Sequence, residues 1–82
     1  MSEPAIREAI LATTAAAGPS RSVSTEDVAR ALATENWQSL LTRIRREATL
    51  LAREGRIDIL RKGKPADPAA EIRGVIRLRT RA

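Results

Sequence analysis

Residues 37–55 read WQSLLTRIRREATLLAREG and carry the longest helical period in the chain. The apolar side chains recur every three or four residues, as on a helix with one face turned toward a core: Trp37, Leu40, Leu41, Ile44, Ala48 and Leu51. Asn36 is a favoured N-cap residue, and Gly55 suits the left-handed position that follows a helix. The stretch therefore predicts a helix over residues 37–54, with Trp37 as part of the core.

A short helix is predicted immediately before this one. Ser24 and Asp27 stand three residues apart, which is the spacing of a capping box, in which side chain and backbone cap each other. The helix therefore begins at Thr25 and ends near Ala33, and only residues 34–36 connect it to the next helix.

The first helix of the chain is bounded by residues that favour helix ends. Ser2 or Glu3 can cap it, and Pro4 suits an opening turn because its missing N–H has no helical partner there. Gly18 and the proline after it end the helix. An extended piece over residues 20–23 then leads to the second helix.

The region after Gly55 changes from the helical period to strand alternation. Residues 57–59 and 74–79 both alternate, which is typical of strands with one buried face. Between them, RKGKP at residues 61–65 indicates a turn. In the second strand Ile76 and Leu78 share one face, and the opposite face carries Val75, Arg77 and Arg79.

Two helices joined by a three-residue turn, with a β-hairpin after the second, form the pattern of a winged helix-turn-helix. The sequence therefore predicts one α+β domain over residues 1–82, with three helices, a C-terminal hairpin wing and room for a short strand after the first helix. The chain resembles winged-helix domains over nearly its whole length. More narrowly, it is similar to a small bacterial domain family of unknown function, through these residues: Trp37, Leu41, Ile44, Arg45, Ala48, Leu51, Gly55, Ile57, Lys62, Gly63, Pro65, Asp67, Pro68 and Gly74 to Leu78.

The composition excludes most catalytic chemistry. The 82 residues include no Cys and no His, so thiol nucleophiles, imidazole bases, structural zinc and iron–sulfur ligation are not expected. The apolar stretch from Ala9 to Gly18 is too short to span a membrane. We therefore expect a cytoplasmic protein that is not an enzyme and uses no cofactor, metal or membrane.

The net charge of +5 is unevenly distributed along the chain. Residues 1–42 carry three Arg against five acidic residues, whereas residues 43–82 carry ten Arg and two Lys against five. Clustered cations neutralise phosphates and release their counterions. Trp37 is the sole aromatic residue, so the chain cannot build the stacking platform that single strands require. Duplex DNA is the expected partner.

The predicted DNA interface consists of helix 37–54, which would enter the major groove, and the basic wing over residues 56–79. Candidates on the helix are Gln38, Ser39, Thr42, Arg43, Arg45, Arg46 and Arg53. Candidates on the wing are Arg61, Lys62, Lys64, Arg77 and Arg79. In this interpretation the helix reads base edges, the wing contacts phosphate or a minor groove, and the chain regulates transcription.

Each part of this interface also has an interpretation without DNA. Glu47 lies four residues after Arg43 and can pair with it on the helix surface. Arg77 and Arg79 can protect an exposed edge strand from pairing with other chains. The alternative function is a winged-helix protein-interaction module, in which the same cations complement an acidic partner protein.

Overall fold

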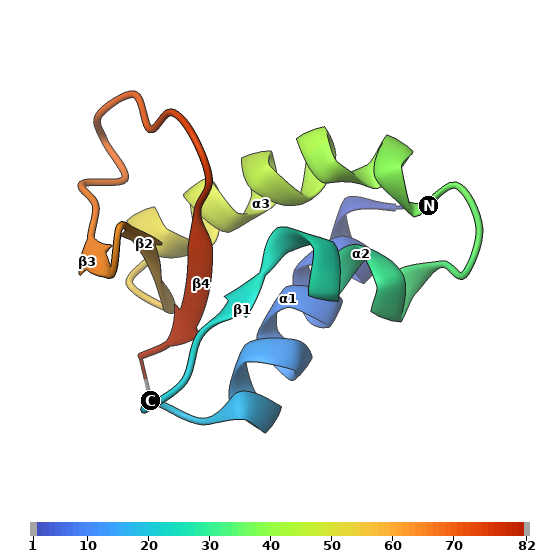
Figure 1. The fold of residues 1–82 in the computed structure, drawn as a ribbon, viewed down its shortest axis with the longest axis horizontal. Helices are drawn as coiled ribbons and strands as arrows, with labels where there is room; N and C mark the ends of the chain where they lie inside the picture. The colour runs from blue at the N-terminus through green and yellow to red at the C-terminus, as the bar shows by residue number, and fades with distance from the viewer. Residues whose placement is uncertain (1, 82) are drawn as a thin grey trace.

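The computed structural model describes residues 2–81, which form three α-helices, a short 3₁₀ helix and four strands (Figure 1). The elements in chain order are α1 (Glu3–Ala17), β1 (Val23–Ser24), α2 (Thr25–Leu32), η1 (Trp37–Leu40), α3 (Leu41–Arg53), β2 (Ile57–Arg61), β3 (Lys64–Pro65) and β4 (Arg77–Thr80). The predicted α+β class is confirmed, and the arrangement is winged-helix-like.

The first two helices begin and end as their capping residues predict. The Ser2 side chain accepts a hydrogen bond from the Ala5 amide, and Gly18 follows α1 with φ of 82°. At α2 both halves of the capping box form: the Asp27 amide donates to Ser24 Oγ over 3.0 Å, and the Ser24 amide donates to the Asp27 carboxylate over 2.9 Å. The hydrogen bond from the Ser24 backbone lowers the pKa of Asp27.

The predicted N-cap of the third helix is wrong. Asn36 has φ of 56°, in the left-handed region, and its side chain makes no cap hydrogen bond. An N-cap needs an extended backbone, so Asn36 cannot serve as one. Its carbonyl instead accepts hydrogen bonds from the Ser39 amide and hydroxyl, which closes the 3₁₀ turn η1. The predicted helix 37–54 is therefore η1 followed by α3.

The end of α3 follows its prediction. Gly55 has φ of 79°, its amide donates to the Ala52 carbonyl, and the Arg56 amide donates to the Leu51 carbonyl. This pair of bonds is a Schellman motif, which places the chain directly into β2.

The four strands form one antiparallel sheet in the order β1-β4-β2-β3. β1 is the short strand allowed for after the first helix, and Val23 pairs with Leu78. β4 begins at Arg77, later than predicted, and lies between β1 and β2 (Figure 1). Because β1 pairs with β4 at Arg77, the interpretation of Arg77 as protection for an edge strand is wrong, whereas Arg79 lies beyond the end of β1.

The wing consists of a tight hairpin and a long return loop. Lys62 and Gly63 have φ of 54° and 81°, and Arg61 pairs with Lys64 across them, which fits a two-residue type I′ turn. Residues 66–76, which we call the strap, then return to β4. The strap passes on the side of the sheet where α3 lies (Figure 1).

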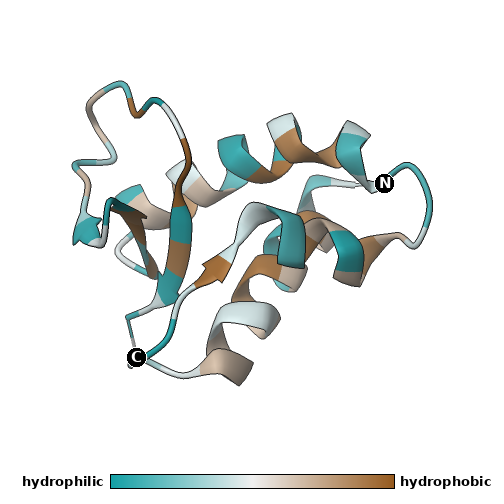
Figure 2. Cartoon of the chain, in the orientation of Figure 1, coloured by the Kyte–Doolittle hydropathy of each residue, from teal (hydrophilic) through white to brown (hydrophobic). Residues whose placement is uncertain are grey.

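The core lies between the three helices and the sheet. Figure 2 shows apolar residues alternating with polar ones along the helices and along β2 and β4, and the buried apolar side chains of these elements form the core. The most deeply buried apolar side chains are Ile6, Ile10, Val28, Ile44, Leu51, Ile57, Ile59 and Leu78. Trp37 is half-buried and packs against this core from its margin, with the Arg30 guanidinium 4.8 Å from the centre of its ring.

Candidate nucleic-acid interface

Two adjacent surface grooves lie where helix and wing meet. The first, the α3 groove, has a volume of about 360 Å³ and is lined by residues 24–26, Leu41, Thr42, Arg45 and residues 74–76. The second, the hairpin groove, has a volume of about 240 Å³ and is lined by Ser22, residues 60–63, Val75 and Arg77. Val75 lines both, so the two grooves form one continuous surface from α3 to the hairpin turn.

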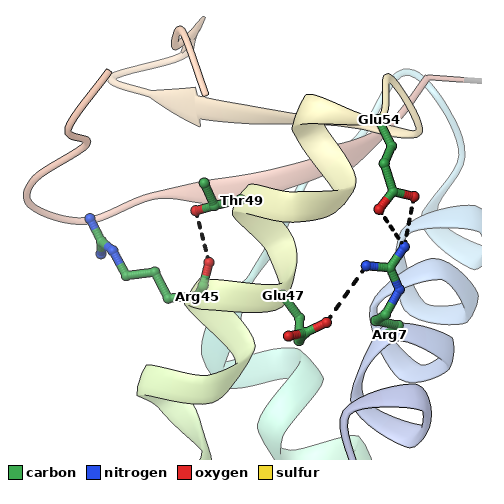
Figure 3. A network of polar contacts seen from close by, with 5 residues as sticks. All are labelled: Arg7, Arg45, Glu47, Thr49 and Glu54. Carbon is green, nitrogen blue, oxygen red and sulfur yellow. Dashed lines mark hydrogen bonds and ion pairs between the residues drawn. The ribbon is translucent and has the colours of Figure 1, made fainter. Parts of the chain in front are cut away.

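The strap is fastened to α3 by two arginines that the sequence suggested for DNA contact. Arg45 Nη2 donates to the Ile72 carbonyl over 2.6 Å, and its Nη1 donates to the Gly74 carbonyl over 2.8 Å. Figure 3 shows Arg45 extending from α3 to the strap, while Thr49 donates to the Arg45 backbone carbonyl. Arg53 Nε donates to the carbonyl of Pro68 over 3.0 Å. These two guanidinium groups therefore position the wing.

Two wing arginines fix the strap and β4 from the sheet side. Arg61 donates a long hydrogen bond of 3.5 Å to the Val75 carbonyl, and its guanidinium occupies the space that a side chain at residue 74 would need. Gly74 has φ of 84°, a backbone conformation that favours glycine, and a side chain at this position would also displace the Arg61 guanidinium. Arg77 donates to the Ser22 hydroxyl and carbonyl over 2.7 and 2.9 Å.

Two other predicted DNA contacts are neutralised by carboxylates. Arg43 pairs with Glu3 at the start of α1 over 2.9 Å, and Arg79 pairs with Asp58 across the sheet over 3.0 Å. The hydrogen bond from Arg43 lowers the pKa of Glu3, and the charge of Arg46 acts in the same direction.

The predicted pairing of Arg43 with Glu47 is wrong. Glu47 is only 5% exposed because it faces α1, where its carboxylate lies 3.6 Å from Arg7 (Figure 3). Arg7 also binds Glu54 over 2.7 Å, and its hydrogen bond lowers the pKa of Glu54. Arg43 and Glu47 thus bind different parts of α1 rather than each other.

The remaining candidates lie on η1, α3 and the hairpin. Ser39 is exposed, but its hydroxyl is used in the turn at Asn36. The others are also exposed, and within residues 2–81 their side chains make no hydrogen bond or ion pair: Gln38, Thr42, Arg46, Lys62 and Lys64. These five side chains are the ones that the fold leaves available to a ligand.

One known protein family matches nearly the whole chain. The sequence model described as "Protein of unknown function (DUF3253)" matches residues 3–81. The chain belongs to this family. No curated protein matches it.

The two grooves and the arginine contacts also involve three residues that the sequence did not suggest. Val75 is 80% exposed, although it is apolar and β-branched. The strand alternation placed Val75 on the same face as Arg77, and an apolar residue on a basic face was a signal for it. Ser22 and Glu3 had no such signal, because their arginine partners lie 55 and 40 residues away in the sequence.

The described residues of this DUF3253 chain contain neither a metal-ligand cluster nor a membrane-spanning helix. Within residues 2–81, no group of three or more acidic side chains could hold a metal ion. Over the same residues, no helix combines the length and apolar character that crossing a bilayer requires.

Proposed function

We propose that this DUF3253 chain binds duplex DNA without catalysis, as a winged helix-turn-helix that regulates transcription. In this proposal α3 enters the major groove and the hairpin turn contacts the phosphate backbone. The observation that carries the proposal is the pair of adjacent grooves that share Val75, with Thr42 of α3 lining the first groove and Lys62 of the hairpin lining the second.

The charge of this surface supports a polyanionic partner. Nine of the proposed contact residues are basic, and only Arg43 and Arg79 among them are paired with carboxylates. Four arginines bind backbone carbonyls, which are neutral, so their positive charge is retained. The other three cations, Arg46, Lys62 and Lys64, are exposed and form no hydrogen bond or ion pair within residues 2–81. Seven of the nine cations therefore form no ion pair with a carboxylate within residues 2–81. Four of these seven, Arg45, Arg61, Lys62 and Arg77, line the two grooves, and Glu26 lines the α3 groove as well.

Within this proposal, three exposed residues of η1 and α3 are assigned to base contacts. Arg45 is held against the strap, so we assign it to positioning rather than to a base contact. Arg46 is exposed on α3 and can bind guanine through two parallel hydrogen bonds, and Gln38 can bind adenine in the same way. Thr42 lies between them on the exposed face of the helix and can contact either base.

Titration with a mixed-sequence duplex tests the proposal, with backbone amide shifts as the readout. We expect a nonspecific dissociation constant of about 10⁻⁴–10⁻⁶ M at physiological salt. Shifts should gather on α3 and the hairpin turn. Amide signals that do not move at millimolar duplex would refute DNA binding.

The salt dependence separates phosphate contacts from base contacts. Each phosphate contact contributes about 0.9 to the slope of log K against log salt, so replacing Lys62 with Asn and Lys64 with Gln should lower the slope by about 1.8. Arg46→Gln should instead cost about 1–3 kcal/mol on a selected sequence and much less on others. Arg21→Gln is the matched control, because Arg21 is exposed, lies outside the helix and the wing, and lines neither groove. Equal slopes for the lysine variant and this control would contradict the hairpin contact.

A protein-interaction module for an acidic partner is the second candidate. The exposed apolar side chain of Val75 among cations favours it, since protein interfaces combine an apolar centre with a charged rim. A labelled peptide of alternating Glu and Leu serves as the probe. Tighter binding of this peptide than of duplex DNA at the same salt would favour the second candidate over the first.

A further inference from the structure

Val75 is an exposed apolar side chain at the centre of a basic surface. It is 80% exposed and is the residue that the α3 groove and the hairpin groove share. Single exposed apolar residues are common on proteins and need no explanation by themselves. The backbone that carries Val75, however, is held more firmly than an exposed loop requires.

Three hydrogen bonds and two apolar anchors hold that backbone. Arg45 binds the carbonyls of Ile72 and Gly74, and Arg61 binds the carbonyl of Val75 itself. Ile76 is 3% exposed, and Ile72 packs against the core from the other side. These contacts restrain the backbone of this segment before any ligand is bound. Preorganisation of this kind strengthens binding, because little further order is imposed when a ligand arrives.

The shape of the side chain selects the kind of contact. Residues that insert between base pairs from the minor groove are Phe, Leu, Ile, Met and Pro, and the short, branched valine is poorly suited to this. The major groove presents one apolar group, the 5-methyl of thymine, and small apolar side chains contact it. Val75 lines the same groove as Thr42 of α3, the helix assigned to the major groove.

We propose that Val75 is a specificity-determining residue that packs against the 5-methyl group of thymine beside the bases read by α3. The inference rests on the proposed function. The inference adds a preference for an A·T pair where Val75 meets the major groove. It also assigns Arg45 and Arg61 as the residues that position the backbone of Val75.

A pair of duplexes that differ only in the thymine methyl tests the inference. One contains alternating A·T pairs, and the other contains uracil in place of every thymine. Wild-type protein should bind the thymine duplex about fourfold more tightly for one contacted methyl, which corresponds to about 0.8 kcal/mol at 1.4 kcal/mol per tenfold. Val75→Ala should bind both duplexes with nearly equal affinity. Leu50→Ala is the control, because Leu50 is 38% exposed on α3 but lines neither groove, and it should keep the wild-type ratio.

The possible outcomes separate this inference from the proposed function. The two duplexes also differ slightly in shape. If shape caused the difference in affinity, Val75→Ala would still prefer the thymine duplex, and this result would overturn the methyl contact. Equal binding of both duplexes by the wild type would overturn it as well, with DNA binding intact. If neither duplex binds at millimolar concentration, the proposed function itself fails. Because Val75 is largely exposed, the variant is expected to fold, and unchanged amide shifts outside the strap would verify this.

Discussion

Replacing Arg45 with methionine isolates the bond between α3 and the strap. The substitution removes both hydrogen bonds, of 2.6 Å to Ile72 and 2.8 Å to Gly74, and leaves an unbranched side chain with similar helix propensity. Arg46→Met makes the same chemical change one residue later, at an exposed position without a hydrogen bond or ion pair within residues 2–81. Comparing the two variants therefore removes the general effects of losing an arginine.

The expected cost follows from the geometry of these bonds. A hydrogen bond that involves a charged group contributes about 1.5–3 kcal/mol when it is shielded from water. Arg45 is only half-buried, and the bond to Gly74 is exposed, so we expect about 2 kcal/mol for both bonds together. Arg46→Met should change the free energy of unfolding by less than about 0.5 kcal/mol, as is usual for exposed sites.

Urea denaturation and amide relaxation measure the two parts of this prediction. With a slope of about 1 kcal/mol per molar urea, the midpoint of Arg45→Met should fall by about 2 M. Backbone order parameters should fall within residues 66–76 and stay unchanged in α1 and α2. If both variants have the same midpoint, and the strap keeps its order parameters in Arg45→Met, then Arg45 does not hold the strap and the positioning role is wrong.

Two further predictions concern the turn and the acid sensitivity of the fold. Lys62→Asn should raise the free energy of unfolding by about 0.5–1 kcal/mol, because Lys62 has φ of 54° and Asn-Gly is the favoured type I′ pair; a lower melting temperature would contradict the turn assignment. The hydrogen bond from Arg7 lowers the pKa of Glu54 below its ordinary 4.5. The ion pair between Arg7 and Glu54 therefore stabilises the fold at neutral pH, and this stabilisation is lost as the pH falls through the lowered pKa of Glu54. Unfolding measured between about pH 6 and pH 3 should therefore show a shallower loss of stability for Glu54→Gln, and identical profiles would argue against the ion pair.

Local signals in the sequence predicted most of the secondary structure. The capping box at Ser24 and Asp27 and the glycines at residues 18 and 55 are confirmed, because each depends on neighbours within about one turn of helix. The period of residues 37–54 correctly predicts the buried face of α3, but residues 37–40 form η1 and Trp37 is only half-buried. Asn36 was the exception. Its left-handed backbone is incompatible with an N-cap, so the helix starts with a 3₁₀ turn.

The sequence by itself determined the fold class and the basic surface, while the tertiary structure decided which cations remain available. The predicted exposure of Thr42 and Arg46 on the helix holds, because a helical period fixes which side chains share a face. The partners of Arg43, Arg45 and Arg77 could not be read in this way. They lie 40, 27 to 29 and 55 residues away along the chain, and only the packing of the strap on α3 and of β4 beside β1 brings them within hydrogen-bonding distance.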